Sequence, residues 1–257
     1  MVSKSIGVFD SGLGGISVLN RCIELLPHED FIYFADKFHA PYGDKSTEDI
    51  ILFMKEVMDN FFMKRDVKAV VVACNTATNA AVDILRNEYD IPIIGTEPAI
   101  KPALIKYNKV KTNNKGKTLV LATESTIRSK KFLNNLSKYD NDSCIKCGCS
   151  GLVELIESNN RTGIVKYLKD KFDTIDKNFV DSVVLGCTHY PFIKKEIVTA
   201  LGKEVTFYDG GEGVARRLKN ILNDKNIIST RKEKGVISVF SSSNEIYNDF
   251  LKSYIEV

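Results

Sequence analysis

Short, uninterrupted apolar runs alternate with longer amphipathic segments along the whole chain, and this alternation most constrains the fold. The first runs are SIGVF, FIYFA and KAVVVA, and segments such as GGISVLNRCIELLP separate them. Repeated strand and helix units of this kind predict an α/β fold. Because the strands lack polar alternate residues, we expect helices on both faces of mostly parallel, doubly wound sheets. In such sheets, ligands bind beyond the carboxyl ends of the strands.

The same reading predicts further elements towards the end of the chain. More strands are expected at IPIIG, KTLVLA, DSVVLG, EVTFYD and GVISVF, and a helix at NEIYNDFLKSYI. The polar stretch KTNNKGK, residues 111–117, predicts a surface turn.

Two halves of the chain repeat one pattern. VVVACNTAT ends its strand at Cys74, and VVLGCTHYP ends its own at Cys187, 113 residues later. The first strand ends at Asp10, and the same interval leads to Thr123 at the end of another predicted strand. A duplicated α/β half explains strand, turn and spacing together.

The two cysteines suggest acid/base chemistry. Each is expected at or just before a helix amino terminus, where free N–H groups and the helix dipole favour the thiolate. If the halves pack face to face, one thiol removes a proton from a carbon and the other delivers a proton to the opposite face, which inverts configuration. For either cysteine taken alone, simple burial in the core is the alternative. Polar donors for a substrate carboxylate are expected from Ser11, Asn75, Thr76 and Thr188.

Composition excludes several other classes of protein. The formal net charge is only +3 and the lysines are scattered, so nucleic acid is not an expected partner. No apolar run reaches the roughly 18 residues of a membrane span, and we expect a soluble, cytoplasmic protein with reduced thiols. Cys144, Cys147 and Cys149 form C-x-x-C-x-C, but no fourth ligand is near, so no metal is expected. Cys22 is expected in the core of a helix.

Four motifs, in this order, carry a resemblance to a known family: FDSGLGG (9–15), FADKFHAPYG (34–43), ACNTAT (73–78) and LGCTHYP (185–191). Together they closely resemble the glutamate racemases of the aspartate/glutamate racemase superfamily, over nearly the whole chain. The resemblance implies cofactor-independent interconversion of L- and D-glutamate, which supplies D-glutamate for bacterial peptidoglycan. It also implies two pseudosymmetric, flavodoxin-like α/β domains with the active site at their interface, and often a homodimer. We place one domain at 1–97 plus 208–257 and the other at 98–207.

The resemblance also assigns roles to residues. It implies that Cys74 and Cys187 are the catalytic thiols, each the base for one enantiomer, and that Asp10 and His189 orient the protons. As alternatives, Asp10 caps the helix that begins near Gly12, and His189 is structural. The positions that match substrate contacts are Asp10, Ser11, Tyr42, Gly43, Asn75, Thr76, Thr123, Thr188 and His189.

The chain departs from the family pattern in two places. ATESTI stands where such proteins commonly have GTxGTI, and Ser150 replaces the usual proline of the linking segment. Glu157 matches, loosely, a glutamate that some members place near the site.

Rival functions use the same residues differently. GLGG after the first strand and Asp36 after the second suggest a dinucleotide-binding turn, but Ser17 replaces the last glycine of that fingerprint. A protein that binds a small amino acid without converting it is a second alternative. An aspartate racemase with the same two thiols is a third.

Overall fold

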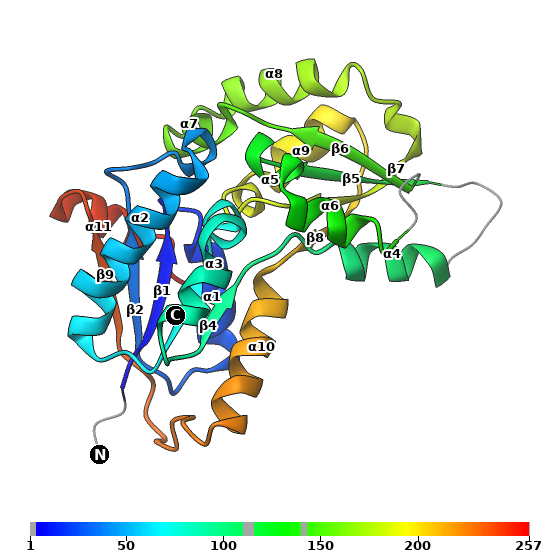
Figure 1. Ribbon diagram of the computed structural model, residues 1–257. Helices are drawn as coiled ribbons and strands as arrows, with labels where there is room; N and C mark the ends of the chain where they lie inside the picture. The colour runs from blue at the N-terminus through cyan, green and yellow to red at the C-terminus, as the bar shows by residue number, and fades with distance from the viewer. Residues whose placement is uncertain (1–3, 110–115, 140–142, 257) are drawn as a thin grey trace. The chain divides into compact units, whose positions relative to one another are not determined.

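The computed structural model describes residues 4–109, 116–139 and 143–256 (Figure 1). The chain divides into two compact units, one made of Met1–Thr96 with Gly211–Val257 and the other of Glu97–Gly210. Residues 111–115 of the predicted surface turn lie outside the described residues. In the parts that are described, every helix is too short or too polar to cross a lipid bilayer.

The first unit is built on a parallel sheet with strand order β4-β3-β1-β2-β9. All of its neighbouring strands pair in parallel. The strands are β1 (Ile6–Asp10), β2 (Phe31–Ala35), β3 (Ala69–Val72), β4 (Ile93–Gly95) and β9 (Ile237–Ser241). Every residue of β1 and β3 is buried, which explains their continuous apolar sequences.

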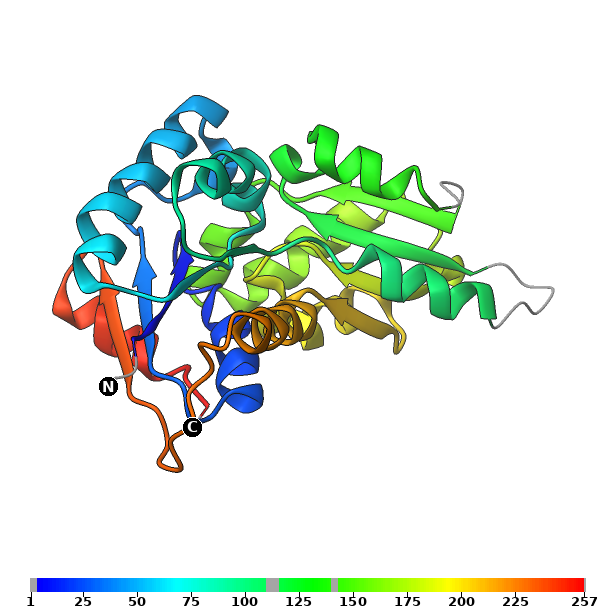
Figure 2. The same ribbon diagram turned by 60° about the horizontal axis from the view of Figure 1, so that its bottom comes forward.

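Helices cover both faces of this sheet. They are α1 (Ile16–Leu25), η1 (Tyr42–Asp44), α2 (Thr47–Val57), η2 (Met58–Phe62), η3 (Met63–Arg65), α3 (Asn75–Glu88), α10 (Gly211–Asp224) and α11 (Glu245–Lys252). Apolar residues of α2 and α3 form one core with β1 and β3. α1 packs against α10, and Figure 2 shows this pair on the other side of the sheet from α2 and α3.

The second unit is built on a parallel sheet with strand order β6-β5-β7-β8. The strands are β5 (Lys117–Ala122), β6 (Cys144–Gly148), β7 (Val180–Leu185) and β8 (Thr206–Asp209). The helices are α4 (Ile100–Lys109), α5 (Glu124–Arg128), α6 (Lys130–Leu136), α7 (Leu152–Glu157), α8 (Arg161–Phe172), η5 (Lys177–Phe179), η6 (Tyr190–Ile193) and α9 (Lys194–Leu201).

Two cores lie on opposite faces of the second sheet. Leu119 and Leu121 pack with α7, α8 and α9, whereas Val120 between them packs with α4 and α6. This alternation follows from the period of two in a strand.

The two sheets share one strand order, which agrees with the predicted duplication. β4-β3-β1-β2 in the first unit matches β8-β7-β5-β6 in the second, and β9 is an addition to the first sheet. The predicted fold class, two α/β regions with parallel sheets, is therefore confirmed. β6 has no counterpart among the predicted strands, because its sequence CIKCG is neither continuously apolar nor rich in β-branched residues.

Candidate active site

Cys74 caps a helix with its sulfur. It follows β3 by two residues and is 7% exposed, and its Sγ accepts a hydrogen bond from the backbone N–H of Ala77 at 3.4 Å. Ser11 Oγ lies 3.9 Å from the same sulfur. Helix N-caps are usually oxygen acceptors, and a thiolate accepts from N–H groups better than a thiol does. Cys74 thus lies at the amino terminus of α3, as predicted, where the helix dipole acts in favour of a thiolate.

Asp10 lies fully buried at the end of β1. Its Oδ1 accepts a hydrogen bond from the backbone N–H of Gly12 at 3.0 Å. The N-cap of α1 is Gly15, which has no side-chain cap, so the alternative in which Asp10 caps this helix is wrong. A Cβ at Gly15 would collide with Asp10 Cβ and the Tyr33 hydroxyl, so a glycine is needed for the turn to approach Asp10 closely.

Tyr42 is held by the carboxylate of Asp36. The Tyr42 hydroxyl donates to Asp36 Oδ2 at 2.7 Å, and burial together with that carboxylate raises the pKa of Tyr42 far above its usual range. His39 Nδ1 lies 2.8 Å from Asp36 Oδ2, and Ser242 Oγ donates to Oδ1 at 2.9 Å. Both oxygens of Asp36 thus have protein partners, which argues against its use as the ribose ligand of a dinucleotide site. Gly43 follows Tyr42 in η1 and is half-buried.

Asn75 and Thr76 open the first turn of α3, next to Cys74. Both are buried, at 5% and 6% exposure. Asn75 Oδ1 is buried without a hydrogen-bond partner in the described part of the chain. Such an unpaired atom costs roughly 1–3 kcal/mol, which a bound ligand with an N–H group would recover.

Cys187 follows β7 through a glycine. A Cβ at Gly186 would lie 2.8 Å from Ala122 Cβ and 2.9 Å from the carbonyl oxygen of Leu121, so this position has no room for a larger residue. Cys187 is 8% exposed. The helix that follows this thiol begins as the 3-10 turn η6 at Tyr190, and the α-helix α9 begins at Lys194.

His189 links the thiol of Cys187 to a carboxylate. Its Nδ1 lies 3.8 Å from Cys187 Sγ, and its Nε2 lies 3.0 Å from Glu157 Oε1. Burial by itself lowers the pKa of His189, but the bonds to Cys187 and Glu157 outweigh it and raise the pKa to about 10. At neutral pH the ring is therefore an imidazolium that donates to both neighbours.

Thr123 and Thr188 lie at the same edge of the second sheet. Thr123 follows β5, and its Oγ1 caps α5 by accepting from the N–H of Thr126 at 3.2 Å. Thr188 is buried between Cys187 and His189 in the chain.

The structure thus brings the predicted residues into two groups, each within one unit. Asp10, Ser11, Tyr42, Cys74, Asn75 and Thr76 lie at the carboxyl ends of β1 and β3 or in the segments that follow the strands of the first sheet. Cys187 and His189 lie after β7, next to the strand β5 that Thr123 follows. Among the described residues, no group of three or more His, Cys, Asp or Glu side chains is arranged to hold a metal ion.

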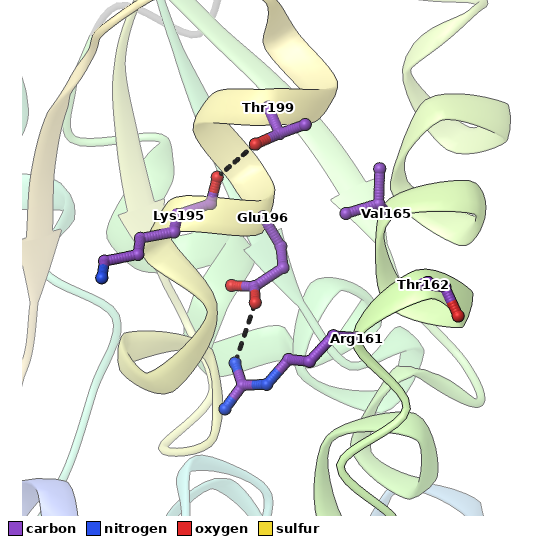
Figure 3. Close-up of a pocket in the computed structure, with 6 residues that line it drawn as sticks. All are labelled: Arg161, Thr162, Val165, Lys195, Glu196 and Thr199. Carbon is purple, nitrogen blue, oxygen red and sulfur yellow. Dashed lines mark hydrogen bonds and ion pairs between the residues drawn. The ribbon is translucent and has the colours of Figure 1, made fainter.

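A separate groove of about 380 Å³ lies between α8 and α9 (Figure 3). Arg161 spans it with an ion pair to Glu196 at 2.9 Å. None of the predicted site residues lines it, so this groove is distinct from both groups. The remaining lining residues are Thr162, Val165, Lys195 and Thr199.

Residues 6–218 match the Asp/Glu/Hydantoin racemase family. The chain belongs to this family. It is 46% identical to the glutamate racemase of Clostridium novyi over 245 residues, which cover 92% of this chain and 90% of that protein. The fold matches a glutamate racemase of Bacillus anthracis with a TM-score of 0.82 at 31% identity, covering 97% of this chain and 92% of that one.

A second solved structure has the same TM-score. The Escherichia coli glutamate racemase, in complex with L-glutamate and the activator UDP-MurNAc-ala, has a TM-score of 0.82 at 28% identity and covers 98% of this chain and 95% of its own. With these relatives, the chain is an amino-acid racemase.

For this racemase, the structure places Glu157 in contact with His189, a contact that sequence reasoning left open. The carboxylate is 10% exposed and makes its bond to His189 from α7, 32 residues earlier in the chain. No spacing rule joins the two residues. The sequence signal is the loose match of this glutamate, at the end of the segment LVELIE, to one in related proteins.

Proposed function

We propose that this chain interconverts L- and D-glutamate without a cofactor, by two-base proton transfer at Cα, and supplies D-glutamate for peptidoglycan synthesis. Cys74 and Cys187 are the two acid/base groups. We further propose that the chain comprises two domains, 1–97 plus 208–257 and 98–207.

The observation that carries the proposal is that matching strands, β3 and β7, each lead to a thiol whose sulfur contacts a polar or charged partner. For Cys74 this is the amino terminus of α3, and for Cys187 it is the imidazolium of His189. A cysteine that served only as core packing would need neither.

The reaction balances with these two groups alone. One cysteine enters as a thiolate and takes the Cα proton, which leaves a carbanion with its charge delocalised into the substrate carboxylate. The other enters as a thiol, gives its proton to the opposite face of Cα and leaves as a thiolate. The reverse reaction exchanges these roles, so each enantiomer has its own base.

Glutamate as the substrate is supported by the relatives. The similar E. coli enzyme is described with L-glutamate bound. In this chain, the unpaired Asn75 Oδ1 is suited to accept from a substrate ammonium group. Ser11 and the neighbouring backbone N–H groups are suited to a carboxylate.

The test is racemisation in D₂O. We expect L-glutamate alone to lose optical rotation, with deuterium at Cα of the first D-glutamate formed and protium kept in the remaining L-glutamate. This pattern is the signature of two separate bases. Deuterium entering substrate and product equally would point to one base and contradict the mechanism.

Cysteine variants and the choice of substrate distinguish this function from the alternative functions. Cys74→Ser and Cys187→Ser should each abolish turnover, whereas Cys144→Ser, a half-buried cysteine of β6, should retain it. If aspartate racemises in place of glutamate, the substrate assignment fails but the mechanism stands. If glutamate binds unchanged, the chain is a binding protein.

A further inference from the structure

Two further thiols lie side by side at the end of β6, which pairs with β5. Cys147 is in β6 and Cys149 directly follows it, and their Sγ atoms are 3.9 Å apart. They are 7% and 1% exposed and belong to the core cluster that also contains Cys187. Cys144 packs against the core of the opposite face, as expected for a residue three positions from Cys147 in a strand. The sequence pattern C-x-x-C-x-C therefore resolves into one adjacent pair and one separate thiol.

The proton is unequally shared within this pair. The hydrogen bond with Cys149 lowers the pKa of Cys147 despite its burial, and the Lys171 ammonium acts in the same direction. The same bond, with burial, raises the pKa of Cys149. By contrast, burial raises the pKa of Cys22 to about 12, which makes that thiol unreactive. Cys147 is thus the sulfur that ionises more readily, and the Cys149 thiol donates to the carbonyl oxygen of Cys147 at 3.6 Å.

We propose that Cys147 and Cys149 form a redox-active dithiol, which a hydroperoxide oxidises to an intramolecular disulfide and a dithiol reductant restores. The site is independent of which amino acid the racemase converts. Its geometry, two sulfurs 3.9 Å apart on one side of the chain, is the basis of the assignment.

The chemistry takes place in two steps. The Cys147 thiolate attacks the terminal oxygen of the hydroperoxide, whose O–O bond breaks, giving a sulfenic acid and an alkoxide or hydroxide. The sulfur of Cys149 then attacks the sulfenic sulfur, and the hydroxyl group leaves with the Cys149 proton as water. The two thiols lose two electrons and the O–O bond gains them. Bonding requires the sulfurs to approach to about 2.05 Å, and Gly148 between them gives the backbone freedom to adjust.

A hydrogen-bonded residue joins this pair to the Cys187 group. The Tyr190 hydroxyl donates to the carbonyl oxygen of Cys149 at 3.5 Å, and the Tyr190 backbone N–H donates to the carbonyl oxygen of Cys187 at 3.2 Å. Closing the disulfide shifts the backbone at Cys149, which Tyr190 transmits towards Cys187. We therefore expect oxidation of the pair to slow turnover reversibly.

Mass spectrometry tests the site itself. The full-length protein is treated with hydrogen peroxide, its remaining thiols are alkylated, and the peptide that carries both cysteines is analysed without reduction. We expect it to be lighter by two hydrogen atoms and unalkylated in the wild type and in Cys144→Ser, while Cys22 stays a thiol. Cys149→Ser should instead stop at a sulfenic acid on Cys147, which dimedone traps. An alkylated, unoxidised pair under conditions that oxidise Cys74 or Cys187 would overturn the proposal, as would a disulfide from Cys147 to Cys187.

A kinetic comparison tests the coupling. Peroxide also attacks the two catalytic thiols, so the relevant quantity is the difference in inactivation rate between the wild type and Cys147→Ser. We expect the wild type to lose activity several-fold faster and to regain that part with dithiothreitol. Equal rates would rule the coupling out. Cys147→Ala provides the same comparison if a serine hydroxyl disturbs the core.

Discussion

Replacing Glu157 by glutamine tests the source of the His189 charge. The carboxylate and the ring nitrogen are 3.0 Å apart, and their side chains are 10% and 3% exposed. An opposite charge at this distance raises the pKa of a histidine by about 1–3 units. We expect Glu157→Gln to lower the His189 pKa by this amount from its value of about 10. At about 1.4 kcal/mol per unit, this corresponds to about 1–4 kcal/mol.

The sign of the stability change follows from linkage. The pKa of His189 is raised from about 6.5 in the unfolded chain to about 10 in the folded one. Its protonation therefore stabilises the fold fully below the lower value, and this contribution is lost as pH rises towards the upper value. In the variant the contribution is smaller and ends at a lower pH.

The assay is NMR titration of ¹⁵N-labelled histidine, together with urea unfolding at neutral pH. Glu154→Gln is the matched control, since Glu154 lies on the same helix, α7, and is exposed. The control should leave the His189 titration where it is in the wild type. If Glu157→Gln leaves it there as well, then Glu157 does not supply the charge that holds the imidazolium.

Three further predictions concern packing, a buried bond and the pair of thiols. Gly186→Ala should lower the free energy of unfolding by about 1–3 kcal/mol, because the new methyl meets the backbone oxygen of Leu121, whereas Gly213→Ala, with open space around it, should not; chemical denaturation measures both. Tyr42→Phe removes one hydrogen-bond donor from the buried Asp36 carboxylate and should lower the free energy of unfolding by about 1–3 kcal/mol in the same assay. An unchanged unfolding midpoint would show that the bond is dispensable. Activity should follow a bell-shaped pH profile that belongs to the two thiols jointly, and a flat profile through mildly alkaline pH would contradict the requirement for one thiolate and one thiol.

Most of the fold was predictable because its strands are buried on both faces. Runs such as VVVA and VVLG have no polar alternate residues, which only a covered parallel sheet accommodates. β6 escaped prediction because it lies at the end of its sheet, paired on one side only, and carries an exposed lysine, Lys146. Its register with β5 comes from tertiary packing, which local composition does not encode.

The site was predictable where chemistry follows a strand end, and not where it depends on contacts between distant segments. Cys74 and Cys187 can be identified from the sequence because each ends a strand at the same position of the repeat. The bond from His189 to Glu157 and that from Tyr42 to Asp36 depend on how loops fold back, so they became visible only in three dimensions. The helix after Cys187 begins as a 3-10 turn, and the contact of the Cys187 sulfur with the His189 ring, at 3.8 Å, was not predictable from that pattern.

The order of the two units along the chain has a consequence for how the protein is made. Residues 97–210 form one unit without interruption, whereas the other unit needs both Met1–Thr96 and the later segment from Gly211. A ribosome adding roughly 5–20 residues per second therefore completes the middle of the molecule before its first unit. Until then α1 lacks its partner α10, and the edge of β2 that later binds β9 stays open. Nascent chains arrested in this interval should be the form of the protein that chaperones hold.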